Sequence, residues 1–273
     1  MLHALLLVCR QSERDFVAAE LYGLDTLGIT EGDLPAEMCE LEAFFAERFD
    51  ERAFFSSYSP QWREHADDAG SEWVDTFEPF AVGERLYIVP AWRDDPIPSG
   101  RLRLAVHVRQ ASGSGYQPAT QLALMALERH LQPADRFLDV GTGSGILSVG
   151  AELLGSGPRF ACDIDLDALA EARENGTPAH LFGGTPRSIA PGSIDLVVAN
   201  LNAEALLSLQ GELVRVLAPG GRLILSGFTA RSLERLTNAF GAHLLETPES
   251  GEWRALVFVT DDSTRSPKIA SFY

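Results

Sequence analysis

The spacing of hydrophobic residues changes along the chain near residue 118. Beyond this point, short apolar runs alternate with stretches in which apolar residues recur every three or four positions, as in strands that alternate with helices. Strands are expected at 137–140, 159–163, 179–182, 194–199, 222–226, 243–247 and 254–259, and helices at 145–154, 167–175, 203–217 and 229–240. The last two strands are expected to be antiparallel, because no helix is apparent between them. This alternation predicts an α/β fold with a doubly wound, mostly parallel, seven-stranded, Rossmann-like sheet.

The first part of the chain follows a different pattern. A strand is predicted over residues 3–9 and a helix over 12–28. From Cys39 to Phe45, apolar residues alternate with mainly acidic ones, which is typical of a half-buried strand. Together these elements predict a small α+β domain over residues 1–57.

Composition changes again at residues 58–70, which are polar and contain Pro60, and this stretch is predicted to be a linker. The second domain is then expected over 71–262, with two additional strands at 85–89 and 101–108. Residues 263–273 are predicted to form a flexible tail.

The charge of the chain limits its partners. The sequence has 39 acidic and 22 basic residues, a net charge of −17. This charge repels phosphate backbones and disfavours direct binding of nucleic acid, whereas a basic protein or a small molecule is an easier partner. The three cysteines fit no metal or redox motif, which suits a cytoplasmic protein. The apolar run Leu5–Cys9 is too short to span a bilayer, so no membrane association is expected.

A glycine-rich loop, Asp139-Val140-Gly141-Thr142-Gly143-Ser144-Gly145, lies between a predicted strand and a predicted helix. Gly141 and Gly143 let the backbone turn tightly and approach a ligand closely. Amides at the start of the following helix can receive an anionic group. A tight turn without any ligand has the same appearance, so the loop alone is weak support for a binding site.

Two polar residues at the ends of predicted strands strengthen the case for a ligand. Asp163 follows Gly141 by 22 residues, and its carboxylate can accept hydrogen bonds from ribose hydroxyls. Asn200 follows the strand 194–199, where a polar side chain faces the ligand crevice and can accept a hydrogen bond from a nucleophilic amine. The alternatives are an ordinary turn residue for Asp163 and a cap or turn residue for Asn200. Asn202 is expected to be the N-cap of the helix that follows.

These features also fit a nicotinamide dinucleotide site. The glycines, however, are spaced G-x-G-x-G rather than G-x-G-x-x-G. The polar segment Asn200-Leu201-Asn202 after the fourth strand also disfavours an oxidoreductase.

Residues 137–145, 160–175 and 195–227 resemble class I S-adenosylmethionine-dependent methyltransferases. More narrowly, residues 72–260 resemble the ribosomal protein L11 methyltransferase family. The stretches that carry this resemblance are Glu72–Pro79, Val82–Trp92, Ser112–Thr120, the glycine-rich loop and Val198–Leu201. The first two of these are more specific than the glycine-rich loop.

The resemblance implies S-adenosylmethionine as cofactor, no metal, and methylation of lysine or N-terminal amines of a basic ribosomal protein. It implies that residues 1–57 recognise this substrate, and we expect a monomer. It assigns catalytic roles to Asn200 and Leu201. The cofactor-binding residues that it implies are Thr120, Asp139, Gly141, Thr142, Gly143, Asp163, Ile164 and Asn200.

The sequence departs from the family pattern before and after the site. Ser112, Ser114, Gln117 and Ala119 stand where the family has Phe, Thr, His and Thr, and Asn202 stands where it has Leu. Two alternatives therefore remain. One is a methyltransferase that acts on another protein or a small molecule, and the other is a cofactor-binding module without turnover.

Overall fold

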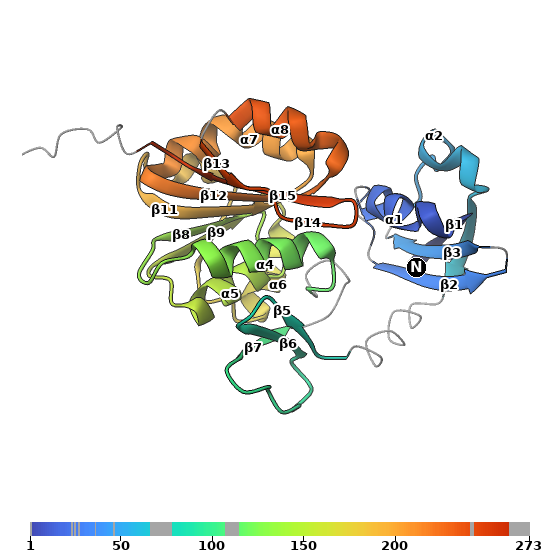
Figure 1. Cartoon of the computed structure of the whole chain (residues 1–273), viewed down its shortest axis with the longest axis horizontal. Helices are drawn as coiled ribbons and strands as arrows, with labels where there is room; N and C mark the ends of the chain where they lie inside the picture. The colour runs from blue at the N-terminus through green and yellow to red at the C-terminus, as the bar shows by residue number, and fades with distance from the viewer. Residues whose placement is uncertain are drawn as a thin grey trace, which may run out of the picture.

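The computed structural model describes residues 2–22, 24, 26, 28–35, 37–45, 47–65, 78–106, 115–240 and 243–261. Its strands form three sheets of four, three and eight strands (Figure 1). The four-stranded sheet belongs to an N-terminal unit, and the other two sheets belong to a larger unit that carries the glycine-rich loop.

The N-terminal unit is an antiparallel sheet with helices packed against it. Its elements are β1 (Leu2–Arg10), a 3₁₀ turn (Gln11–Glu13), α1 (Arg14–Tyr22), β2 (Gly28–Leu34), β3 (Met38–Phe45), α2 (Arg52–Phe55), a second 3₁₀ turn (Ser56–Tyr58) and β4 (Gln61–His65). The strand order is β2-β3-β1-β4. The alternation predicted for β3 is confirmed, since Cys39, Leu41, Ala43 and Phe45 are all buried. They pack with Val17, Leu21 and Phe55 from the helices.

Two predictions about this unit were wrong. The helix predicted over 12–28 ends at Tyr22, and residues 28–34 form strand β2 instead. Two glycines in that strand, Gly28 and Gly32, weaken its sequence signal. The predicted linker 58–70 contains strand β4, which pairs with β1 and extends the unit to His65. Residues 66–77 and the predicted tail from 263 lie outside the described residues.

A small three-stranded sheet opens the larger unit. It consists of β5 (Phe80–Val82), β6 (Leu86–Pro90) and β7 (Leu102–Val106), with β5 antiparallel and β7 parallel to β6. Two of these are the strands predicted at 85–89 and 101–108. The sheet lies against helices of the larger unit and projects from it (Figure 1).

The eight-stranded sheet follows the predicted alternation closely. Its strands are β8 (Phe137–Val140), β9 (Arg159–Asp163), β10 (His180–Gly183), β11 (Ile194–Asn200), β12 (Leu217–Thr229), β13 (His243–Glu246), β14 (Glu249–Ser250) and β15 (Trp253–Val259). Seven of them run in the order β10-β9-β8-β11-β12-β15-β13, and β14 pairs with β15. The five strands from β10 to β12 are parallel, whereas β15 is antiparallel to both its neighbours, as expected for the last pair. The sheet has one strand more than predicted, because the two residues of β14 are too few to show an alternating pattern.

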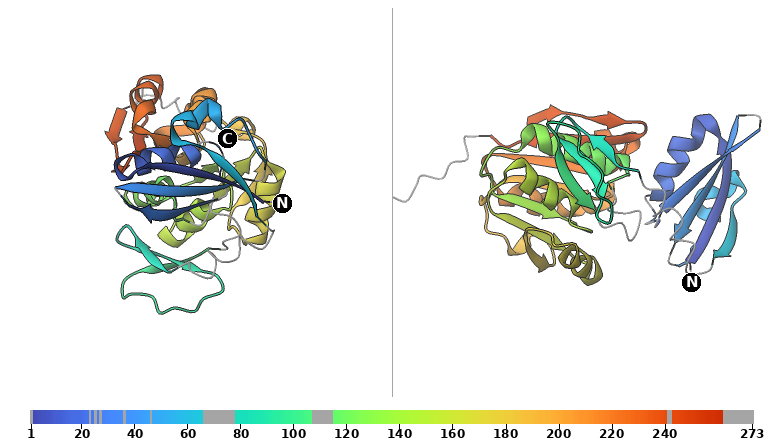
Figure 2. Two further views of the ribbon diagram at one scale, coloured as in Figure 1. Left: turned by 90° about the vertical axis from the view of Figure 1, so that its right-hand side faces the viewer. Right: turned by 90° about the horizontal axis from the view of Figure 1, so that it is seen from below.

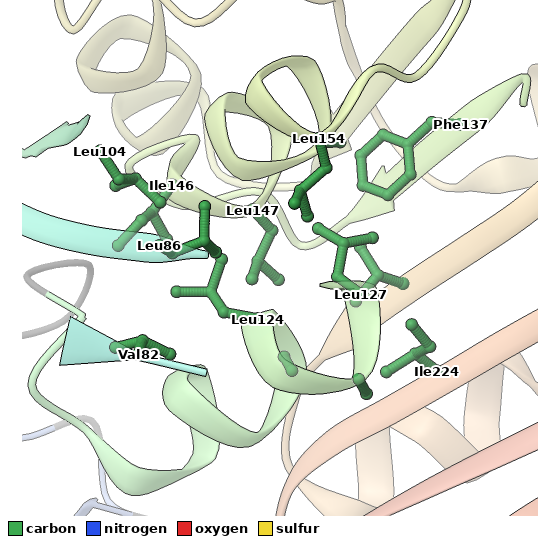
Figure 3. Close-up of a cluster of buried hydrophobic side chains, with 14 of the residues drawn as sticks. Val82, Leu86, Leu104, Leu124, Leu127, Phe137, Ile146, Leu147, Leu154 and Ile224 are labelled. Atoms are coloured by element: carbon green, nitrogen blue, oxygen red, sulfur yellow. The ribbon is translucent and has the colours of Figure 1, made fainter. Parts of the chain in front are cut away.

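Helices cover both faces of this sheet. They are α4 (Pro118–His130), α5 (Ile146–Leu154), α6 (Leu166–Glu174), α7 (Ala203–Val216) and α8 (Leu233–Phe240). Buried side chains of α4 and α5 pack on one face, and those of α7 and α8 pack on the other. On the first face, Leu86 of the small sheet lies beside Leu124 and Leu147, and Phe137 of β8 belongs to the same cluster, so that both sheets share one core (Figure 3).

The two units meet at a small contact between α1 and the segment after β12. The guanidinium of Arg231 lies 4.0 Å from the ring centre of Phe16 and 3.4 Å from an oxygen of Glu20. Figures 1 and 2 show α1 on the side of the N-terminal unit that faces the larger one. Within the described parts of the chain, no helix is long and apolar enough to cross a membrane.

Candidate active site

The predicted site residues meet at the carboxyl ends of three adjacent strands. The glycine-rich loop follows β8, Asp163 ends β9 on one side of it, and Asn200 ends β11 on the other. The chain order reverses between β8 and β11, and ligands of open α/β sheets bind at such a switch point.

The backbone of the glycine-rich loop is held in a fixed shape. The amides of Gly141 and Thr142 both donate to the carbonyl of Cys162, at 2.9 and 3.1 Å. Gly141, Gly143 and Gly145 all have positive φ, at 71°, 52° and 86°. A Cβ at Gly141 would collide with the Leu201 side chain, whereas one at Gly143 would meet no protein atom within 4 Å. The loop therefore packs against Leu201 at Gly141 and is open at Gly143, where a ligand can approach the backbone.

Asp139 is the first residue of the glycine-rich segment, and its side chain is fully buried. Its Oδ2 accepts hydrogen bonds from the hydroxyls of Thr142 and Ser148, both at 2.9 Å. Burial raises the pKa of Asp139 to about 6, although the two hydroxyls oppose this effect. Asp139 and Thr142 were predicted to bind the cofactor, and this stays a prediction. The hydrogen bond between their side chains helps to hold the loop in shape.

Asp163 connects the loop to the turn after β9. Its Oδ2 accepts from the amide of Gly143 at 3.0 Å, and its Oδ1 accepts from the amide of Asp165 at 3.0 Å. The side chain is half-buried. Each carboxylate oxygen retains a second lone pair, so that two ribose hydroxyls can still donate to it.

Two apolar side chains next to Asp163 are unusually exposed. Ile164 is 80% exposed and Leu166 is 71% exposed. Ile164 was predicted to bind the cofactor and Leu166 was not. Their exposure beside a polar carboxylate offers an apolar surface to a flat ring bound through its ribose.

Asn200 is held by hydrogen bonds on both ends of its amide. Its Nδ2 donates to Oγ1 of Thr120 at 3.1 Å, and its Oδ1 accepts from Oγ of Ser226 at 2.9 Å. Thr120 lies in the first turn of α4, 80 residues away in sequence, and is 2% exposed. The structure thus brings together two residues that were predicted to share one site.

The residues after Asn200 have distinct roles. Leu201, predicted to be catalytic, donates its amide to the carbonyl of Ser226 at 3.0 Å and packs its side chain beside Gly141. Asn202 accepts from the amide of Ala205 at 2.9 Å, which confirms the prediction that it is the N-cap of α7.

Three residues around the site were missed in the sequence. They are Ser148 under Asp139, Asn175, which donates to the carbonyl of Ser144 at 3.0 Å, and Ser226. Ser226 follows the rule that singled out Asn200, because it is a polar residue near the carboxyl end of a buried strand. The departures at Ser112 and Ser114 lie outside the described residues.

The polar groups at this site suit an organic cofactor. The residues that the structure describes include no group of three or more His, Cys, Asp or Glu side chains placed to hold a metal. The open space above Gly143, the lone pairs of Asp163 and the exposed Ile164 fit a nucleoside with a polar chain attached to its ribose.

Comparisons with known proteins agree with this description. A family model for ribosomal protein L11 methyltransferase (PrmA) matches residues 36–261. The chain is 37% identical over 213 residues to a ribosomal protein L11 methyltransferase of Geotalea uraniireducens, covering 70% of this chain and 67% of that protein. It is 39% identical over 199 residues to the protein of the same name from Geobacter metallireducens, covering 70% and 66%. The match thus spans about two thirds of the length of these curated relatives.

A solved structure shows the same relationship. The crystal structure of a ribosomal protein L11 methylase from Lactobacillus delbrueckii subsp. bulgaricus superposes with a TM-score of 0.61 and 29% sequence identity. The superposition covers 68% of this chain and 98% of that one. Because the family model extends over most of the sequence and includes every predicted site residue, the chain belongs to the ribosomal protein L11 methyltransferase (PrmA) family.

Proposed function

We propose that this protein is an S-adenosylmethionine-dependent methyltransferase that methylates amino groups of ribosomal protein L11. The observation that carries this proposal is the convergence of an open glycine-rich loop, Asp163 and the Thr120–Asn200 pair at one edge of the sheet. The names of the relatives supply the acceptor, ribosomal protein L11. The proposal includes a monomeric, cytoplasmic enzyme.

Each part of the cofactor has a matching part of the site. Asp163 would accept hydrogen bonds from the ribose hydroxyls, and Ile164 would cover one side of the adenine ring. The exposed backbone at Gly143 gives room for the methionine chain, which approaches where a side chain would otherwise stand. Asp139 and Thr142 would act indirectly, by holding this loop in shape.

The cofactor supplies an electrophilic methyl group on a sulfonium, so the protein needs no covalent nucleophile. The protein must position the acceptor amine in line with that methyl group and exclude water from it. A lysine amine has an ordinary pKa of about 10.4 and must lose a proton before it reacts. Asn200 is neutral, so it can orient an uncharged amine without stabilising the ammonium form. Its amide cannot take the proton, for which water is the acceptor that we propose.

Recognition of the protein substrate is assigned to the N-terminal unit. This unit has its own buried core and touches the catalytic unit near the carboxyl end of β12, through Arg231. Its helix α1 therefore lies on the same side of the catalytic sheet as the site. The net charge of −17 favours a basic partner such as a ribosomal protein.

The order of strands argues against a nicotinamide oxidoreductase. In dinucleotide-binding sheets of the order 3-2-1-4-5-6, all the strands are parallel. Here the antiparallel strand β15 stands between β12 and β13. The half of the sheet that would bind the second nucleotide therefore differs from that of dinucleotide-binding enzymes. This difference disfavours a nicotinamide oxidoreductase.

Mass spectrometry tests the proposal directly. The protein is incubated with labelled S-adenosylmethionine and ribosomal proteins from a host that lacks the modification. We expect label on lysine or N-terminal amines of L11. Label on another protein would mean that this protein, and not L11, is the acceptor. Tight cofactor binding without any label would identify a binding module without turnover.

A further inference from the structure

Ser226 is a buried polar residue in the active-site region to which no role has been given so far. It is 0% exposed and lies in β12, directly opposite Asn200 of β11. Its hydroxyl lies 2.9 Å from Oδ1 of Asn200. A hydroxyl buried this deeply needs a hydrogen-bond partner, and Asn200 provides it.

The backbone around Ser226 holds the same segment. The carbonyl of Ser226 accepts the amide of Leu201 at 3.0 Å, one residue after the side-chain contact. The next residue, Gly227, has a φ of 89°, and a Cβ there would lie 2.6 Å from the carbonyl oxygen of Leu201. This end of β12 therefore fixes both the backbone and the side chain of the Asn200–Leu201 pair.

The contact matters because the two ends of a carboxamide have opposite chemistry. The oxygen of Asn200 accepts hydrogen bonds, whereas its nitrogen donates them. With Ser226 donating to the oxygen and Thr120 accepting from the nitrogen, one lone pair and one N–H remain for ligands. Rotation about the terminal torsion of asparagine is soft and roughly two-fold, so loss of one anchor lets the amide turn.

We propose that Ser226 is a positioning residue for methyl transfer, which acts by fixing the orientation of the Asn200 amide toward the acceptor amine. This inference rests on the proposed function, in which Asn200 orients that amine. In this role Ser226 acts through Asn200, because its own side chain is fully buried.

The first test is Ser226→Ala, which removes the hydroxyl and little volume. We expect kcat for L11 methylation to fall about fivefold to tenfold, the range for one hydrogen bond. The KM for L11 and the Kd for S-adenosylhomocysteine should stay within twofold. Thr260→Val is the matched control, since Thr260 bonds through its hydroxyl to Ala218 at the opposite end of β12. That variant should keep the wild-type kcat.

A double-mutant cycle separates positioning from general support. If Ser226 acts through Asn200, Ser226→Ala should have no further effect on kcat in an Asn200→Ala background. Equal effects in both backgrounds would overturn the inference, as would a kcat within twofold of wild type in the single variant. Ser226→Cys, which keeps a weak donor of similar size, should retain more of the wild-type kcat than Ser226→Ala does.

The side-chain amide of Asn200 gives a readout that needs no turnover. Its two ¹⁵N-bound protons, identified by their loss in Asn200→Ala, should give sharp, separate signals in the wild-type protein without cofactor. They should broaden or shift toward the values of a mobile asparagine side chain in Ser226→Ala, and unchanged signals would overturn the inference. If the wild-type protein fails to methylate L11, the proposed function fails, while these amide signals still decide whether Ser226 orients Asn200.

Discussion

In the catalytic unit, the polar residues that end β9 and β11 have defined partners from other segments of the chain. Asp163 bonds to Gly143 of the glycine-rich loop, and Asn200 bonds to Thr120 and Ser226. The N-terminal unit is built around a small apolar core. The family model matches from residue 36, so β1, α1 and β2 fall outside the match. In the proposed function, methyl transfer needs each of these polar side chains at one position, whereas recognition of L11 by the N-terminal unit would depend on a larger surface.

The two units also fold around separate cores. Among the described residues, the cluster that contains Leu41 and Phe55 shares no member with the three clusters of the catalytic unit. This separation predicts that changes in one unit leave the function of the other intact, and the following experiments test that expectation.

The largest effect should come from removing the N-terminal unit. A chain that starts at residue 66 retains all three buried clusters of the catalytic unit and should bind S-adenosylhomocysteine with a Kd within twofold of the full chain. Methylation of L11 should fall more than 100-fold, because the substrate is no longer held near the site. Calorimetry and a labelling assay measure the two quantities. Methylation of L11 at the full rate would remove the recognition role.

Within the catalytic unit, Asn200→Ala should lower kcat by about 100-fold or more through misplacement of the acceptor amine. Cofactor affinity should weaken only slightly. The control is Asn202→Ala, which removes the N-cap of α7 and should cost about 1 kcal/mol of stability while leaving kcat nearly unchanged. Single-turnover rates and thermal melts distinguish the variants. The reverse pattern would mean that this segment serves another acceptor.

Asp163→Ala should act on cofactor affinity. Its carboxylate would form charged hydrogen bonds to the ribose, and their loss should weaken binding of S-adenosylhomocysteine by about 1.5–3 kcal/mol. Asp165→Ala is a suitable control, because Asp165 caps α6 through its own side chain and lies two residues from the site carboxylate. Calorimetry on both variants measures the difference. An unchanged affinity in Asp163→Ala would exclude Asp163 from the ribose site.

The smallest effect concerns the pH dependence of folding. The pKa of Asp139 is about 6, above its ordinary value of 3.8. The neutral carboxyl therefore contributes its full stabilisation when the pH is below 3.8, and this contribution is lost as the pH rises through about 6. Asp139→Asn cannot ionise, so its stability relative to wild type should improve by about 1 kcal/mol between pH 5 and pH 8. Urea unfolding at both pH values measures this, and a constant difference would contradict it.

The sequence was a good guide to the catalytic unit because its strands are short apolar runs separated by helices. The predicted strand at 159–163 coincides with β9, and the predicted helix at 203–217 differs from α7 by one residue. Strand β2 was missed because Gly28 and Gly32 weaken its signal, and β4 was missed because its partner is distant in sequence. Strand β4 pairs with β1, more than 50 residues earlier, and its Arg63 and Glu64 give no apolar alternation.

At the site, strand ends identified Asp163 and Asn200, but sequence alone did not show how they are held. The contact between Asn200 and Thr120 crosses 80 residues and depends on where α4 packs. The burial of Asp139 follows from the position of β8 at the centre of the sheet, since a central strand with helices on both faces leaves its side chains no solvent. Such relations are set by packing and become visible only in three dimensions.

The open space at Gly143 has a consequence for how this loop evolves. Gly141 and Gly145 face Leu201 and Thr177, so a side chain at either position disturbs the protein itself. Gly143 faces no protein atom, and only its φ of 52° restricts replacement, a restriction that asparagine and aspartate tolerate. We therefore expect Gly141 and Gly145 to be kept in relatives that retain this fold, and Gly143 to be kept only in relatives that still bind a ligand there. Among distant relatives, an asparagine at this position would mark a protein that has lost its cofactor and kept its fold.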